Sequence, residues 1–248
     1  MRTTADTHGP TGNRLLAMLP GAEYERIIPH LERASFSLGE VVYESGGQMA
    51  HVYFPTTAIV SLLYVMENGS SAEMGVAGND GLVGIALFMG GDSMPNRAVV
   101  QSAGEAVRIK AKVMQDEFKR GGEFQRLLLR YTQALITQMS QTAVCNRHHT
   151  VEQQLCRWLL LSRDRLDTDE LVMTQELIAN MLGVRREGVT VAAGRLQEQG
   201  LISYVRGRIR VLDRRGLERA VCECYRVVRD EYERLLGKNP SFKAETLK

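Results

Sequence analysis

The chain has few of the residues that mark several large protein classes. It contains four cysteines, six prolines and one tryptophan in 248 residues. So few cysteines exclude a fold held together by many disulfides, and so few prolines exclude a collagen-like or proline-rich chain. The densest apolar stretch, Ile59 to Met66, is interrupted by Ser61 and is far too short to span a bilayer.

The first thirteen residues are polar and lack the apolar core of a secretory signal peptide. We therefore expect a cytoplasmic protein that does not bind membranes, with residues 1–13 as a disordered tail. The length of 248 residues is sufficient for two modest hydrophobic cores, and this predicts two domains.

Motifs of the common catalytic sites are also missing. The sequence has no G-x-S-x-G motif and no P-loop. Small β-barrels can host metal oxygenases, and these need two histidines and a carboxylate around the iron. Residues 36–110 contain a single histidine, His51. An enzyme is the rival class, but we predict a protein with no catalytic residues and no cofactor.

The net charge of +2 is unevenly distributed along the chain. Residues 1–144 carry 12 Lys and Arg against 14 Asp and Glu, whereas residues 145–248 carry 19 against 15. Between residues 185 and 215 there are eight arginines, no lysine and three acidic residues. Such a segment suits contacts with phosphates or guanine edges, although a solvated helix face would have the same composition.

Two patterns divide the chain. A short helix is expected over residues 22–34, and short β-type runs separated by glycines follow from Phe36 to about Ile109, which predicts a small β-barrel or β-roll. After Val113 the apolar residues recur at helical spacing. Residues 123–150 predict a helix about 42 Å long, which is too long to be covered by one small domain.

We interpret this long helix as the core of a parallel homodimer, because apolar and small polar residues recur along it at alternating spacings of three and four. The alternative is a helix that packs on its own β-domain. The proposed seam consists of Leu128, Tyr131, Leu135, Gln138, Thr142, Cys145 and His149.

The cap, turn and helix-ending residues between Thr174 and Ser203 predict a helix, a turn, a second helix and a strand. Thr174 is a suitable N-cap residue and Gly183 a suitable turn residue. The second helix is expected from about Arg186 to Gln199 and ends at Gly200, after which residues 204–210 predict a hairpin with Gly207 at its tip. Before the motif, residues 151–166 predict a helix and residues 167–170 a polar turn. Together these elements predict a winged helix-turn-helix.

The second helix of a helix-turn-helix lies in the DNA major groove, and its first residues reach base edges. Arginine can bind guanine and glutamate can accept a hydrogen bond from cytosine. We therefore assign base contacts to the start of the second helix, and backbone contacts to the flanking residues and the arginine-rich wing. The predicted DNA-binding residues are Thr174, Gln175, Arg185, Arg186, Glu187, Thr190, Arg206, Arg208 and Arg210. Gly188 and Gly194 weaken this helix, and close approach to DNA or to the first helix would compensate.

From about Leu15 to Asp213 the chain resembles the cyclic-AMP-receptor and fumarate-nitrate-regulator (Crp/Fnr) superfamily of transcription regulators. The resemblance is carried by the runs LGEVVYESG (residues 38–46), VYF (52–54), TQE (174–176), LGV (182–184) and LQEQGLI (196–202). It implies that Arg186 and Glu187 read bases and that Val191 occupies a third such position, where it cannot form a hydrogen bond.

The resulting fold is α+β and multidomain, with an N-terminal cyclic-nucleotide-binding-like β-roll, a long dimerisation helix and a C-terminal winged helix-turn-helix. We assign residues 1–13 to the tail, 14–115 to the β-roll sensor domain, 116–150 to the dimerisation helix, 151–213 to the DNA-binding domain and 214–248 to a C-terminal helix and tail. The partners implied are double-stranded DNA, a second copy of the chain, RNA polymerase and a small-molecule effector. The alternative is a nucleotide- or small-molecule-sensing module that acts without DNA, but the arginine-rich wing argues against it.

The resemblance also places a ligand pocket at Gly84, Ile85, Arg97, Ala98, Met139 and Ser140. Members that bind cyclic nucleotides have a glutamate where this chain has Ile85, and a serine or threonine where it has Ala98. We therefore expect that cyclic AMP is not the physiological effector, because a ribose hydroxyl buried against Ile85 would lack a hydrogen-bond partner.

The cysteines are expected to be free thiols. Cys145 and Cys156 lie eleven helical residues, or about 16 Å, apart, so one metal ion cannot bind both. Cys222 and Cys224 are expected to point to opposite sides of one helix and to serve in packing. The sequence therefore predicts no metal site, although Cys145 and His149 are one helical turn apart. The family's iron-sulfur sensors use N-terminal cysteines, and this chain has none before Cys145.

Overall fold

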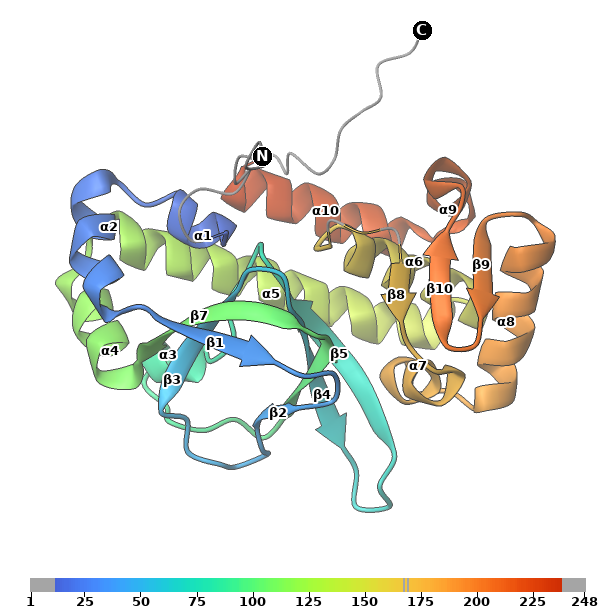
Figure 1. Cartoon of the computed structure of the whole chain (residues 1–248), viewed down its shortest axis with the longest axis horizontal. Helices are drawn as coiled ribbons and strands as arrows, with labels where there is room; N and C mark the ends of the chain where they lie inside the picture. Colours follow the sequence, from blue (N-terminus) through green and yellow to red (C-terminus); the bar gives the residue numbers. More distant parts are fainter. Residues whose placement is uncertain (1–11, 167, 169, 238–248) are drawn as a thin grey trace, which may run out of the picture. The chain divides into compact units, whose positions relative to one another are not determined.

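A computed structural model describes residues 12–166, 168 and 170–237. The chain divides into two compact units. The first comprises Met1–Val65 and Val76–Thr132, and the second comprises Met66–Gly75 and Gln133–Lys248. Figure 1 labels the helices and strands of both units. Within the described residues, no helix combines the length and the apolar character needed to cross a bilayer.

The first unit is built on a β-roll of two antiparallel sheets. One sheet has the strand order β1-β7-β3 and the other β2-β6-β4-β5. The bounds of its strands are β1 Glu32–Phe36, β2 Val41–Tyr43, β3 His51–Pro55, β4 Ile59–Val65, β5 Ser71–Ala77, β6 Arg97–Ser102 and β7 Gly104–Lys110. Those of its helices are α1 Arg14–Ala17, α2 Gly21–Ile27, α3 Ala86–Met89 and α4 Ala111–Arg120, with a 3₁₀ turn, η1, at Ile28–His30.

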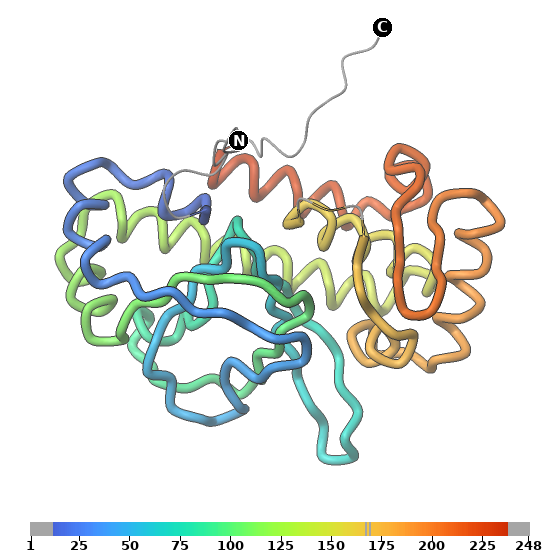
Figure 2. The backbone as a smooth tube through the Cα atoms, viewed as in Figure 1, coloured from blue at the N-terminus to red at the C-terminus, as the bar shows by residue number. Residues whose placement is uncertain are grey.

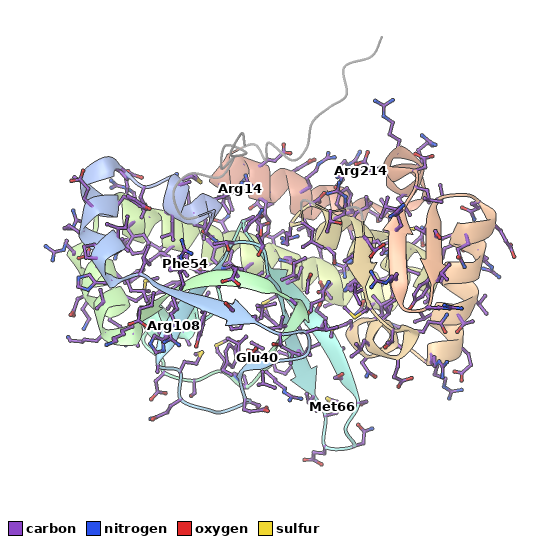
Figure 3. The ribbon with its side chains drawn as sticks, viewed as in Figure 1. Arg14, Glu40, Phe54, Met66, Arg108 and Arg214 are labelled. Carbon is purple, nitrogen blue, oxygen red and sulfur yellow. The ribbon has the colours of Figure 1, made fainter. Side chains whose placement is uncertain are left out.

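Alternation along the strands produces the core of the roll. Val52 and Phe54 on β3 are fully buried, and β7 contributes the buried Ile109 opposite Val52. Phe54 is labelled in Figure 3. The expected β-roll is therefore present. The helix predicted over residues 22–34 is shorter than expected, because β1 begins at Glu32 and pairs with β7.

Asn13 belongs to the folded part of the chain, and its assignment to a tail is wrong. Its side-chain oxygen accepts hydrogen bonds from the backbone N–H groups of Leu15 and Leu16, and so caps α1. Its Nδ2 donates to the carbonyl oxygens of Pro55 at 2.8 Å and Gly81 at 2.9 Å. Residues 1–11 of the predicted tail lie outside the described residues.

The long helix is α5, Gly122–His148, which Gly121 separates from α4, and Gly121 and Gly122 both adopt positive φ. The face predicted to be the dimer seam is buried within the chain itself: Leu128, Tyr131, Leu135, Gln138, Thr142 and Cys145 are all at most 4% exposed. Tyr131 donates its hydroxyl proton to Leu82 O in the first unit, and Gln138 donates to the Tyr232 hydroxyl in the second. This seam assignment is wrong, because the spacing of three and four marks a buried face without identifying what covers it.

A different face of α5 is left exposed. It carries the apolar residues Leu129, Ile136 and Val144, which are 50%, 55% and 47% exposed. Leu129 and Ile136 are seven residues apart, so they lie on one side of the helix, and Val144 follows eight residues later, about 80° further around it.

The second unit contains the C-terminal half of α5, a three-stranded sheet of order β8-β10-β9 and five further helices. Their bounds are α6 Val151–Arg163, β8 Glu170–Val172, α7 Gln175–Leu182, α8 Arg186–Glu198, β9 Ile202–Val205, β10 Arg208–Val211, α9 Arg214–Ala220 and α10 Glu223–Leu236. Strand β8 was not expected, because residues 167–170 were interpreted as a turn. Figure 2 traces the chain from β8 through α7 and α8 to the β9–β10 hairpin.

All four cysteines are buried free thiols. The placement of Cys222 and Cys224 on opposite sides of one helix is wrong, because α10 begins at Glu223 and Cys222 precedes it as the N-cap residue with φ −72° and ψ 165°. Both thiols consequently lie in one cluster with Cys145, and the Sγ atoms of Cys145 and Cys222 are 3.6 Å apart.

Replacing Asn13 tests how strongly the first helix is fixed to the β-roll. Asn13→Ala removes the cap of α1 and leaves the Pro55 and Gly81 carbonyls without the amide donor, so we expect a loss of about 2 to 4 kcal/mol in the free energy of unfolding. Urea denaturation measures this loss. Asn146→Ala, at an exposed position of α5, is the control and should change stability little. A loss below about 0.5 kcal/mol for Asn13→Ala would contradict the assigned role.

Candidate nucleic-acid interface

The first helix of the candidate interface is capped and terminated as the sequence predicts. The Thr174 hydroxyl accepts a hydrogen bond from Leu177 N at 3.2 Å and so caps α7. Gly183 ends α7 with φ 65°, a conformation that glycine adopts without steric cost. A Cβ at Gly183 would also lie 3.1 Å from the Ala72 side chain. The turn into α8 thus depends on this glycine.

The second helix, α8, has one buried and one exposed face. Its buried face consists of Val189, Ala192, Ala193 and Leu196. Arg186, Glu187, Thr190 and Val191 are exposed, and Val191 is 56% exposed. The predicted base-reading residues therefore share the solvent-facing side of α8. Arg185 is also exposed, at the N-cap position, and makes no capping hydrogen bond with its side chain.

Of the two explanations given for the glycines of α8, a close approach of the first helix is wrong. A Cβ at Gly194 would meet no atom within 4 Å, and one at Gly188 would make an ordinary contact of 3.8 Å with Val151 on α6. Neither glycine allows a close approach of α7. The other explanation, close approach to DNA, stays a prediction for Gly194, which leaves space on the exposed face of α8.

Thr190 links the two helices. Its hydroxyl lies 2.9 Å from Gln175 Oε1 on α7 and 3.0 Å from the carbonyl oxygen of Arg186. Gln175, which is assigned to the DNA backbone, and Thr190, which is assigned to the bases, are therefore neighbours.

The wing is the hairpin of β9 and β10, which Figure 1 shows beside α8. Val205 pairs with Arg208, so Arg206 and Gly207 form a two-residue turn, and both have positive φ (51° and 78°) as a type I′ turn requires. Met173 N donates to Gly207 O at 2.7 Å, which ties the tip of the wing to the start of α7.

Tyr204 holds the wing to both helices. Its N–H donates to Gln197 Oε1 on α8, and its hydroxyl donates to Met173 O, each at 2.8 Å. Burial raises the pKa of Tyr204, and the nearby positive charge of Arg186 opposes this rise. Tyr204 therefore stays a neutral hydrogen-bond donor beside the arginine.

Most of the predicted DNA-binding residues line two hollows, and Arg206 lines both of them. A hollow at the wing tip is lined by Thr174, Gln175, Glu176, Arg186, Tyr204, Arg206 and Gly207. Within the described part of the chain, no carboxylate forms an ion pair with Arg185, Arg186 or Arg206. These three guanidinium groups are exposed and available to an anionic partner.

A second hollow lies along the wing and is lined by Glu170, Arg206, Arg208 and Arg210 among others. Arg208 and Arg210 alternate with the buried Ile209, and Glu170 of β8 pairs with both of them. The Nη2 atom of Arg210 lies 3.8 Å from Glu170 Oε2. Arg206 lines this hollow together with Arg208 and Arg210, so the three wing arginines share one surface, on which Glu170 pairs with two of them.

Buried charges attach α9 to α6. Asp164, which follows α6, accepts hydrogen bonds from Arg214 Nη2 at 2.7 Å and from the Tyr225 hydroxyl at 3.0 Å. Arg214 is labelled in Figure 3. Burial raises the pKa of Asp164, and the positive charge of Arg214 opposes the rise. The ion pair of Asp164 and Arg214 therefore fixes the segment that directly follows β10 to the end of α6.

The predicted ligand-pocket residues have few free polar groups. In the first unit Arg97 Nε lies 3.2 Å from the Glu44 carboxylate, Ala98 is fully buried, and Ile85 is half-buried at the start of α3. Gly84 has φ 107°. In the second unit Met139 is half-buried on α5, and the Ser140 hydroxyl donates to Ile136 O in its own helix.

Sequence reasoning missed Glu170 and Tyr204. The run ELV (residues 170–172) is too short to be recognised as a strand, so the pairing of Glu170 with the wing had no visible signal. Tyr204 was placed in the hairpin, but a single aromatic residue does not indicate which backbone groups it binds.

Two family models match the chain. A cyclic nucleotide-binding domain matches residues 33–120, and a Crp-like helix-turn-helix domain matches residues 153–220. Together they cover more than half of the chain. A search of curated proteins found no match.

Several solved structures share this fold. A CRP-family transcriptional regulator from Thermus thermophilus is 18% identical, with a TM-score of 0.63 over 76% of this chain and 95% of that one. FixK2 from Bradyrhizobium japonicum is 17% identical, with a TM-score of 0.64 over 77% and 98%. The c-di-GMP-responsive global regulator CLP of Xanthomonas campestris is 16% identical, with a TM-score of 0.63 over 78% and 100%.

Proposed function

Because the chain belongs to the Crp/Fnr superfamily of transcription regulators, we propose that it binds an inverted-repeat DNA operator as a homodimer and regulates transcription without cyclic AMP. The observation that carries this proposal is the exposed face of α8, where Arg186 and Glu187 lie in the first turn. RNA polymerase is the partner that such a regulator would contact at a promoter.

The base-reading role follows from the chemistry of the exposed groups. Arg186 can bind O6 and N7 of a guanine, and Glu187 can accept a hydrogen bond from N4 of a cytosine. Val191 can contribute only an apolar contact, for example with a thymine methyl group. Arg206 at the wing tip would bind the phosphate backbone, which carries no sequence information.

The homodimer would use the exposed face of α5. A two-stranded coiled coil requires apolar residues that return to one side of the helix about every seven residues. Leu129 and Ile136 meet this requirement, Val144 borders the same face about 80° further around the helix, and all three are about half exposed in the single chain. Two copies of the helix-turn-helix would then face two half-sites of an inverted repeat.

Independence from cyclic AMP follows from three side chains of the first unit. Ile85 offers no acceptor to a ribose hydroxyl, Ala98 offers no hydroxyl to a phosphate, and Arg97 is engaged by Glu44. The β-roll would bind another small molecule or act as a fixed part of the dimer. The rival function, a sensing module that acts without DNA, gives no role to the exposed arginines Arg185, Arg186 and Arg206.

Three arginine variants test which side chain reads a base and which binds the DNA backbone. Arg186→Ala should cost about 1 to 3 kcal/mol of binding free energy at one base pair per half-site and leave other positions unchanged. Arg206→Ala should weaken all sequences alike and reduce the salt dependence by about one phosphate contact. Arg208→Ala is the matched control with a smaller effect, because Glu170 already neutralises that arginine. Competition binding with single-base operator variants measures these losses. Equal, sequence-independent losses for Arg186→Ala and Arg206→Ala would refute base reading by Arg186.

A charged side chain on the exposed face of α5 tests the dimer proposal. Ile136→Lys places an ammonium group at the proposed interface, so the variant should sediment as a monomer at micromolar concentration, where the unmodified chain sediments as a dimer. Met66→Lys is the control, since Met66 is 63% exposed and lies off α5. Dimers of unchanged stability in both variants would show that α5 does not form the interface.

Isothermal titration tests the independence from cyclic AMP. We expect no saturable one-to-one binding of cyclic AMP with a dissociation constant below about 10 μM, since each missing polar contact costs about 1 to 3 kcal/mol and each 1.4 kcal/mol is about a tenfold loss. The double variant Ile85→Glu, Ala98→Ser should bind more tightly because it restores both groups. Tight binding by the unmodified chain, coupled to stronger operator binding, would disprove this part of the proposal.

A further inference from the structure

Four side chains with metal-binding atoms meet at one place in the second unit. They are Cys145 in the last turn of α5, His149 directly after that helix, Cys222 at the N-cap of α10 and Cys224 in its first turn. One ligand atom from each lies within 4.8 Å of every other. The two pairs of residues are more than seventy positions apart in the sequence, so the fold alone brings them together.

The separations fit the coordination sphere of a single ion. Cys145 Sγ is 3.6 Å from Cys222 Sγ, and Cys224 Sγ is 3.6 Å from His149 Nδ1. A tetrahedral zinc ion with Zn–S bonds of about 2.3 Å and a Zn–N bond of about 2.0 Å requires S–S edges of about 3.8 Å and S–N edges of about 3.5 Å. These two of the six separations match the edges of a tetrahedral site, and the other four lie within 4.8 Å.

The other ring nitrogen of His149 has a suitable partner. Its Nε2 lies 3.3 Å from a carboxylate oxygen of Glu223. Histidines that bind zinc usually donate their second N–H group to a carboxylate, which fixes the tautomer and orients the ring. Glu223 thus lets Nδ1 present its lone pair toward the three thiols.

A buried positive charge beside the thiols provides an independent observation. Arg157 on α6 is only 5% exposed, and its Nη1 donates to the Thr142 hydroxyl at 3.1 Å, but its Nε has no hydrogen-bond partner among the described residues. Its charge acts on both Cys145 and Cys224. A zinc ion with three thiolates and one histidine carries one net negative charge, which the Arg157 guanidinium would balance.

We propose that Cys145, His149, Cys222 and Cys224 bind one zinc ion in a closed Cys₃His site. Sulfur and imidazole ligands in a tetrahedral arrangement favour zinc over the hard cations Mg²⁺ and Ca²⁺. With four protein ligands and no open position, the site is structural. It fastens the start of α10 to the end of α5.

Two further features show how zinc could enter the site and what its binding would stabilise. A surface hollow lined by Val221, Cys222, Glu223 and Arg226 reaches one of the four ligands, Cys222, from solvent. Helix α10 also packs on α6, which supports the recognition helix α8. The ion therefore stabilises the C-terminal helices on the DNA-binding unit, and Cys156, whose thiol is buried on α6, takes no part in it.

Metal analysis of the full-length protein tests the proposal. The chain is produced without an affinity tag in zinc-supplemented medium, purified without chelators and analysed by plasma mass spectrometry. We expect one zinc ion per chain. Cys224→Ala and Cys222→Ala should lose the ion, whereas Cys156→Ala, the matched control, should retain it. Glu223→Gln should keep all four ligands but lower the zinc affinity by about 10-fold to 100-fold.

A cobalt experiment on the unmodified chain avoids any dependence on the folding of the variants. Removal of zinc followed by addition of Co²⁺ should give the intense visible bands of tetrahedral cobalt and a thiolate charge-transfer band in the near ultraviolet, and Zn²⁺ should abolish both. Four free thiols with no metal bound after addition of zinc or cobalt, a Cys145–Cys222 disulfide in the purified protein, or equal metal content in Cys224→Ala would each overturn the proposal.

Discussion

The burial of α6 is the constraint on which the second unit depends. Nine consecutive residues of this helix, Gln154 to Ser162, are buried, so it has no solvent-facing side along that stretch. A helix covered on all sides requires neighbours on all sides, and α7, α8, α9 and α10 supply them. The polar groups that α6 takes into this core must be satisfied there. Arg157 therefore lies against Thr142 and the thiols, and Asp164 against Arg214 and Tyr225.

Helix α5 is constrained in a related way. Its 27 residues bury one face in each unit through contacts such as Tyr131 with Leu82 and Gln138 with Tyr232. Only the opposite face, with Leu129, Ile136 and Val144, is left for a second copy of the chain. The same helix would thus support the sensor domain, the dimer interface and, at its end, the zinc ligands Cys145 and His149.

Local patterns predicted much of this architecture. Thr174 acts through a hydrogen bond to its own helix, and Gly183 and Gly207 act through their own backbone conformation, so their roles as cap, turn and wing tip are visible in the sequence and are present in the structure. The exposed side of α8 followed from helical periodicity. The β-roll followed from short strands and glycines.

Features that depend on distant contacts could not be predicted in the same way. Periodicity identified the buried face of α5, but one sequence does not distinguish a face covered by its own chain from one covered by a partner. Cys222 was misplaced because helix boundaries are uncertain by one or two residues, and here one residue moves the thiol from a helix side to a cap. The meeting of Cys145 with Cys222 spans 77 residues and leaves no local signal. The pairing of Glu170 with Arg208 has the same cause.

The central claim, that two copies of α8 read an inverted repeat, is tested most directly by selecting binding sites from a pool of random duplex DNA at fixed salt concentration. The account predicts enrichment of an inverted repeat whose half-site centres lie about 10 bp apart, one turn of the double helix. Enrichment of a single unrepeated motif, or no enrichment at all, would contradict it.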